Sequence, residues 1–257
     1  MKGFSLFTPL VGSMMMITAI IISMTMIQSD AHSAKSFNRV MIMDEARMQA
    51  RIIQAGVSSS LLINIEKAIN KVVEDVINRG AVSCNSNRCE HAIKGLIKSK
   101  LEEKDKEIFY ASAHGDYENV WMDIAGMISN DYLSGMGCSG QDRLEKYMNC
   151  LSNALSNQQQ SSSLIEANWR GETLTVRINP PQPGTELAEL FNIKANVGDS
   201  STPSTITVNV LPRAISYERD MEISCTPCDS GQAACSVDGQ QITVSCVSST
   251  GGGFNRI

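Results

Sequence analysis

The sequence predicts an α+β protein with a long hydrophobic N-terminal helix, a helical middle region and a C-terminal antiparallel β domain, stabilised by disulfides. Apolar residues recur at helical spacing as far as about residue 157. From about residue 161 the pattern changes to short alternating runs separated by turn residues. We therefore divide the chain into a leader with a membrane helix (residues 1–57), a helical region (residues 58–157) and a β region (residues 161–257).

Length and charge limit the classes of function. A chain of 257 residues is long enough for two modest folded units. The formal net charge is −5, which gives no reason to expect a nucleic-acid partner. We also expect no cofactor, no bound metal and no catalytic residues, because the histidines His32, His91 and His114 have neither metal-ligand spacing nor a neighbouring nucleophile motif.

The chain opens with an uncharged segment from Phe4 to Ile27. A helix needs roughly 20 apolar residues to cross the hydrocarbon core, whereas a cleavable signal has a shorter apolar part of roughly 7–15 residues. We therefore predict a single-pass membrane helix; a signal cut after Ala34 is the alternative. Lysine and arginine counts favour a cytoplasmic C-terminal side, whereas the eight cysteines favour an extracellular one, which we expect.

The first residues also carry a processing pattern. Lys2 and Gly3, followed by Phe4 and an apolar helix, resemble the cleavage site of type IV prepilins, and the segment TPLVGS from Thr8 is similar to the opening of many archaeal pilin-like proteins. The resemblance covers roughly the first 55 residues. It implies that a prepilin-type peptidase of the membrane cuts after Gly3, and that the mature chain begins at Phe4 and forms a homo-oligomer through its helix. The pattern departs from bacterial pilins at Thr8, where they usually carry glutamate.

Helices are predicted through the first 157 residues. One continuous helix is expected from about Ser5 to Ala55, although a membrane helix followed by a separate helix fits the sequence equally well. A second helix is expected from a cap among residues 58–60 to Gly80, because its apolar positions form one stripe. Further predicted segments are a helix over residues 91–109, a short helix or strand pair over residues 117–135, and a helix from a Ser139 or Asp142 cap to about Ser156.

The β region begins after a polar linker at residues 156–163. Residues typical of strands alternate there with turn residues such as those of NPPQPG. Strands are predicted over residues 173–179, 189–197, 204–212, 221–225 and 240–247.

The cysteines predict disulfides confined to each region. The expected pairs are Cys84–Cys89, Cys138–Cys150, Cys225–Cys246 and Cys228–Cys235, although spacing does not determine connectivity. Two alternatives remain open: a redox pair formed by Cys225 and Cys228, or one zinc ion held by all four cysteines of the β region. A redox pair of this spacing normally opens a helix, and that context is missing here.

These observations lead to a structural role. We expect a subunit of a type IV pilus-like filament at the cell surface, with adhesion as an associated activity and no enzymatic one. The first alternative is a membrane-anchored extracellular binding module. The second is an extracytoplasmic thiol oxidoreductase that acts through Cys225 and Cys228.

Overall fold

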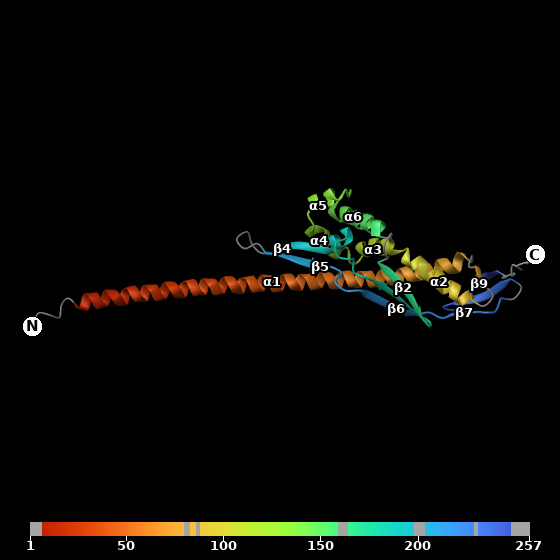
Figure 1. The fold of residues 1–257 in the computed structure, drawn as a ribbon, viewed down its shortest axis with the longest axis horizontal. Helices are drawn as coiled ribbons and strands as arrows, with labels where there is room; N and C mark the ends of the chain where they lie inside the picture. The colour runs from red at the N-terminus through yellow and green to blue at the C-terminus, as the bar shows by residue number, and fades with distance from the viewer. Residues whose placement is uncertain are drawn as a thin grey trace, which may run out of the picture. The chain divides into compact units, whose positions relative to one another are not determined.

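A computed structural model describes residues 7–79, 83–85, 88–158, 164–197, 204–228 and 231–247 (Figure 1). The expected processing residues Gly3 and Phe4 lie outside the described residues. The protein is α+β, with helices, mixed and antiparallel sheets and four disulfides. Its contacts divide the chain into two units, Met1–Gln49 with Asn196–Ile206 and Ala50–Ala195 with Thr207–Ile257.

The first helix, α1 (Phe7–Arg79), is a single element of 73 residues. The predicted break between Ala55 and the serines at residues 58–60 is therefore wrong. Gly56 allows a close approach rather than ending the helix, because a Cβ atom there would lie 2.8 Å from a γ-carbon of Val120. Ser60 is buried inside the helix, where its hydroxyl donates to the carbonyl oxygen of Val57 at 2.9 Å. Gly56 and Ser60 thus both serve tertiary contacts, because the Ser60 hydroxyl also accepts from the indole of Trp121.

The part of α1 in the first unit has an exposed apolar surface. Several of its methionine side chains are largely exposed, namely Met24, Met26, Met41 and Met48, and Met43 is exposed to a smaller degree. Within the described residues, no helix is both long enough and apolar enough to span a bilayer.

The part of α1 in the second unit carries the predicted core face. Leu61, Ile65, Ile69, Val72 and Val76 recur at intervals of three and four residues, and each is buried. This spacing places them on one side of the helix, which packs into the hydrophobic core. The predicted apolar stripe is confirmed as a core face.

Among the residues that the structure describes, six shorter helices follow in the second unit. They are α2 (Cys89–Glu102), α3 (Asp105–Ala113), α4 (Glu118–Met127), α5 (Asn130–Gly135), α6 (Arg143–Gln158) and α7 (Glu186–Phe191). The single helix predicted over residues 91–109 is two, separated by a turn at Glu103 and Lys104 that leads Ile108 and Phe109 into the core. Of the two caps proposed for α6, Asp142 is confirmed, because its Oδ1 accepts from the backbone N–H of Glu145 at 2.7 Å.

Most of the strands in the described part of the second unit belong to two sheets. The strands are β1 (Ser83–Asn85), β2 (Ile165–Arg170), β3 (Thr173–Ile178), β6 (Ile215–Asp220), β7 (Ile223–Cys225), β8 (Gln232–Val237) and β9 (Gln240–Val247). One sheet has the order β1-β9-β8-β7 and the other β2-β3-β6. The second is antiparallel, but β1 joins β9 in parallel, so the antiparallel prediction holds for all these pairs except one.

A third sheet pairs β4 (Asn192–Val197) with β5 (Ser204–Asn209). The strand predicted over residues 189–197 begins later than expected, because Thr185 starts α7 by accepting a hydrogen bond from the backbone N–H of Ala188. Leu190 and Phe191 are therefore buried from a helix rather than from a strand.

Helix α2 connects the helices with the sheets. It contacts β2 as well as β1, β7 and β8. In Figure 1, α2 lies next to β2 and β7. The indole of Trp169 in β2 donates to the carbonyl oxygen of Lys94 at 3.0 Å. The backbone N–H of Ala167 donates to the carboxylate of Glu102 at 3.2 Å. These two hydrogen bonds hold the middle and the end of α2 against β2.

Candidate functional site

The eight cysteines form four disulfides: Cys84–Cys89, Cys138–Cys150, Cys225–Cys235 and Cys228–Cys246. The two pairs predicted in the helical region are confirmed, as is the prediction that no bridge joins the two regions. The two pairs predicted in the β region are wrong, because their partners are exchanged.

Strand register explains the exchange. Cys225 lies directly opposite Cys235 in the antiparallel pair of β7 and β8, with their Cα atoms 4.0 Å apart. Strand β8, which places Cys235 opposite Cys225, was not predicted from the sequence. Cys228 follows β7 and is then left to pair with Cys246 of β9.

Two of these disulfides lie side by side. The sulfur of Cys89 is 3.5 Å from that of Cys228, and the sulfur of Cys84 is 4.0 Å from that of Cys228. Together with Cys246, they form a group whose four sulfur atoms all lie within 4.8 Å of one another; we call it the four-sulfur cluster. The zinc alternative had placed Cys225 and Cys235 in such a group, and the structure instead supplies Cys84 and Cys89.

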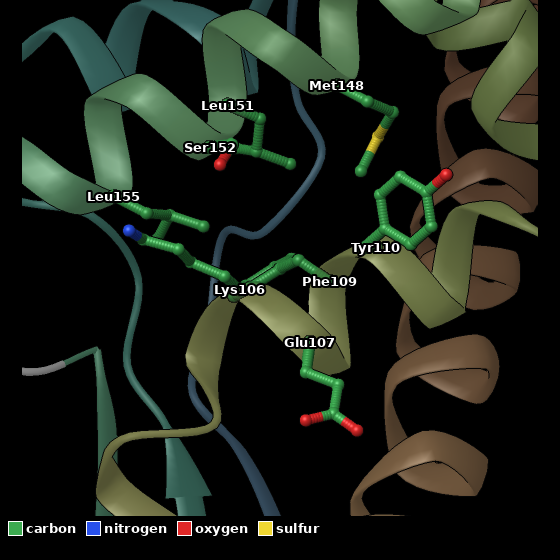
Figure 2. Close-up of a pocket in the computed structure, with 8 residues that line it drawn as sticks. All are labelled: Lys106, Glu107, Phe109, Tyr110, Met148, Leu151, Ser152 and Leu155. Atoms are coloured by element: carbon green, nitrogen blue, oxygen red, sulfur yellow. The ribbon is translucent and has the colours of Figure 1, made fainter.

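A hollow of about 250 Å³ lies between α3 and α6. Figure 2 shows its lining residues, which are Lys106, Glu107, Phe109, Tyr110, Met148, Leu151, Ser152 and Leu155. Its floor is apolar, because Phe109, Met148 and Leu155 are buried. The Glu107 carboxylate points away from the α6 side chains (Figure 2), so the hollow offers an apolar surface with few polar groups.

The carboxylate of Glu107 joins α3 to α1 instead. Its oxygen atoms accept from Lys104 and from Lys71, the latter at 2.5 Å. The hydrogen bond from Lys104, followed by the one from Lys71, lowers the pKa of Glu107 below its ordinary value. The hydrogen bond to Glu107 raises the pKa of Lys71. Both groups are charged at neutral pH, and their role is to hold two helices together.

Polar groups inside the second unit also have structural partners. The indole of Trp121, which is fully buried, donates to the hydroxyl of Ser60 at 3.3 Å, and Ser112 donates to the carbonyl oxygen of Ile108 at 2.6 Å. Tyr147 donates to the carbonyl oxygen of Leu190 at 3.3 Å, and burial raises the pKa of this phenol. The Trp121 bond joins α4 to α1, the Tyr147 bond joins α6 to α7, and the Ser112 bond lies within α3.

One partly exposed phenol has a strongly shifted pKa. Burial, followed by a hydrogen bond to Glu189, raises the pKa of Tyr132 to about 12. The phenol therefore stays protonated at physiological pH and serves as a donor between α5 and α7.

The structure describes the side chains of two of the three histidines. His91 and His114 are exposed, and His114 stacks on Tyr110 with ring centroids 4.3 Å apart. The side chain of His32 is outside the described ones.

Comparison with known protein families, with curated proteins and with solved structures finds no match for this chain.

Proposed function

We propose that this protein is a structural subunit of a type IV pilus-like filament at the cell surface. The observation that carries the proposal is α1, a helix of 73 residues. Its later residues, such as Leu61 and Ile65, belong to the core of the second unit, whereas earlier apolar side chains, including Met24, Met26 and Met41, are exposed.

Exposed methionines favour an assembly with further copies of the chain. Burying one such side chain contributes roughly 1.5–3 kcal/mol. A helix that presents several of them gains stability when it packs against identical helices. The sequence supplies the second support, because Gly3 and Phe4 precede an uncharged run in the order that the prepilin resemblance requires.

The disulfides support an extracytoplasmic position for the folded second unit. Bridges of this kind persist in oxidising compartments and are rare in the cytosol. Four of them in the second unit suit a domain at a cell surface. The precursor would enter the membrane through residues 4–27 and would then be cut by a prepilin-type peptidase on the cytoplasmic side.

The test is the N-terminal residue of the protein purified from its native cells. We expect mass spectrometry to find a mature chain that begins at Phe4, and Gly3→Val to block this cleavage. We also expect electron microscopy to find the protein in surface filaments that the variant lacks. An intact Met1 would contradict the processing, and a cut near Ala34 would remove the assembling helix and reject the proposal.

The hollow between α3 and α6 favours a second candidate, a membrane-anchored binding module. Its buried floor of Phe109, Met148 and Leu155 next to the exposed Tyr110 suits a small apolar ligand. A protein that remains monomeric under conditions in which the cell makes filaments would favour this candidate over the filament subunit.

A further inference from the structure

The four-sulfur cluster has the size of a metal site. A tetrahedral zinc ion with Zn–S bonds of about 2.3 Å separates its sulfur ligands by about 3.8 Å. The contacts between the two bridges, at 3.5 Å and 4.0 Å, lie on either side of this value. We propose that Cys84, Cys89, Cys228 and Cys246 bind one zinc-class divalent cation as four thiolates once a dithiol has reduced both bridges.

The backbone holds the four cysteines in place independently of the bridges. Cys84 lies opposite Cys246 in the parallel pair of β1 and β9. Strand β9 is paired with β8 up to Ser245, and the backbone N–H of Cys246 donates to the carbonyl oxygen of Gly231 at 2.8 Å. Strand β8 is in turn paired with β7, which ends three residues before Cys228. Cys89 is the first residue of α2, which packs on the same sheet. Reduction therefore needs only side-chain rotation to bring four sulfurs around one ion.

The surroundings favour thiolates at this position. The N-terminus of a helix carries a partial positive charge, which stabilises a thiolate and lowers its pKa. Cys89 occupies that position in α2, a helix of 14 residues, and it follows directly after Arg88. Four thiolates around a divalent cation carry a net charge of −2, so both features stabilise the loaded site.

Burial within the cluster is graded. Cys84 and Cys89 are buried, whereas Cys228 and Cys246 are partly exposed. The exposed pair gives a dithiol and then a metal ion access from solvent, and the buried pair shields the loaded site from competing water. Among the described residues, no second group of cysteine, histidine or carboxylate side chains is arranged closely enough to hold a metal ion.

The chemistry balances with the dithiol as reductant. Each dithiol gives two electrons and two protons to one bridge, which opens to two thiols while the dithiol closes to a cyclic disulfide. Four protein thiols then release four protons to solvent as their sulfurs bind the cation. Metal affinity is therefore expected to rise with pH. The site concerns the disulfide-bonded unit alone and does not depend on the proposed filament.

The test uses the full chain in detergent, reduced by a dithiol and loaded with Zn²⁺ or Co²⁺ under anaerobic conditions. After gel filtration, we expect about one metal ion per chain by plasma mass spectrometry, and with Co²⁺ the absorption bands of tetrahedral thiolate coordination. Less than about a tenth of an ion per chain would reject the proposal.

Serine variants assign the ligands. We expect Cys228→Ser and Cys246→Ser each to lower the bound metal at least tenfold at a limiting chelator concentration. The matched control is the double variant Cys225→Ser/Cys235→Ser, which removes a bridge from the same sheet and should still bind one ion. Circular dichroism checks that each variant is folded, and Cys84→Ser provides a second test from the opposite bridge. Equal binding by all variants would identify an adventitious ion only and would reject the proposal. Loss of metal in the control alone would also reject it.

Discussion

The helical region and the β region differ in how their cysteines find partners. In the helical region, Cys138, which lies between α5 and α6, pairs with Cys150 of α6, 12 residues away. In the β region, Cys225 passes over the nearer Cys228 and pairs with Cys235, because strand register places them opposite each other. The nearest cysteine along the chain is therefore the partner in the helical region, whereas strand register selects the partner in the β region.

The two tryptophans give the largest expected contrast between the regions. Trp121 in α4 is fully buried and donates to Ser60, whereas Trp169 in β2 is partly buried. We expect Trp121→Ala to lower the free energy of unfolding by about 3–5 kcal/mol, through lost packing and a cavity. Trp169→Ala should cost roughly 2 kcal/mol, because less surface and one hydrogen bond to Lys94 are lost.

Urea denaturation followed by fluorescence measures both changes. The chain contains only two tryptophans, so each variant keeps a single reporter in the opposite region. Coincident transitions from fluorescence and circular dichroism would show that the two regions unfold together. An equal cost for the two variants would contradict the contrast in burial.

Single cysteine variants test the register argument directly. In Cys225→Ala we expect the free thiol at Cys235, whereas the pairing expected from the sequence would leave it at Cys246. In Cys138→Ala, the matched case in the helical region, the free thiol should be Cys150. Each lost bridge should cost about 3 kcal/mol, given loops of 10 and 12 residues.

Alkylation followed by peptide mapping under non-reducing conditions identifies the thiol in each variant. A thiol at Cys246 in Cys225→Ala would contradict the register of β7 and β8. Mixed products in that variant alone would show that the β region exchanges its bridges.

The sequence predicted what depends on local periodicity. The core stripe of α1, the Asp142 cap of α6 and the disulfides of the helical region each depend on residues close together in the chain. Strands β1, β2, β6 and β8 were missed. Strand β1 has three residues and exists only through its parallel partner β9, about 160 positions away, which no local pattern reveals. The four-sulfur cluster was missed for the same reason, since it joins cysteines of both regions.

The ion bridge at Glu107 gives a smaller, pH-dependent effect. Folding lowers the pKa of this carboxyl below its ordinary value of 4.5, through hydrogen bonds from Lys104 and Lys71. A lowered pKa in the folded state means that the stabilisation is complete above the ordinary value and is lost as pH falls through the lower, folded-state pKa. We expect Glu107→Gln to cost about 0.5 kcal/mol at pH 7, since the pair is largely exposed, and less at pH 3.

The measurement is the free energy of unfolding of both proteins at the two pH values. The control is Glu103→Gln, a change at an exposed glutamate just after α2. It should leave the free energy of unfolding close to that of the wild type at both pH values. If the cost of Glu107→Gln grew as pH fell, the pH dependence would have the opposite sign, and the ion bridge would be contradicted.

Two glycines test a place where local sequence misled in a helix. Gly56 and Gly95 both lie inside helices, where glycine is about 1 kcal/mol less favourable than alanine. A Cβ atom at Gly95 would meet no atom within 4 Å, so Gly95→Ala should stabilise the protein by up to about 1 kcal/mol. At Gly56 the same atom would lie 2.8 Å and 3.1 Å from the γ-carbons of Val120.

Valine has a stiff side chain, so α4 must shift to accept that Cβ atom, and Gly56→Ala should destabilise the protein despite its better helix propensity. Val120→Ala removes both γ-carbons and leaves a Cβ atom 3.5 Å away, which is an ordinary contact. In that background Gly56→Ala should therefore become stabilising. Thermal unfolding of the wild type, both single variants and the double variant measures the coupling between the two positions. Equal effects of Gly56→Ala in both backgrounds would mean that α4 does not approach α1 at this point, and Gly56 would then be only a weak helix residue.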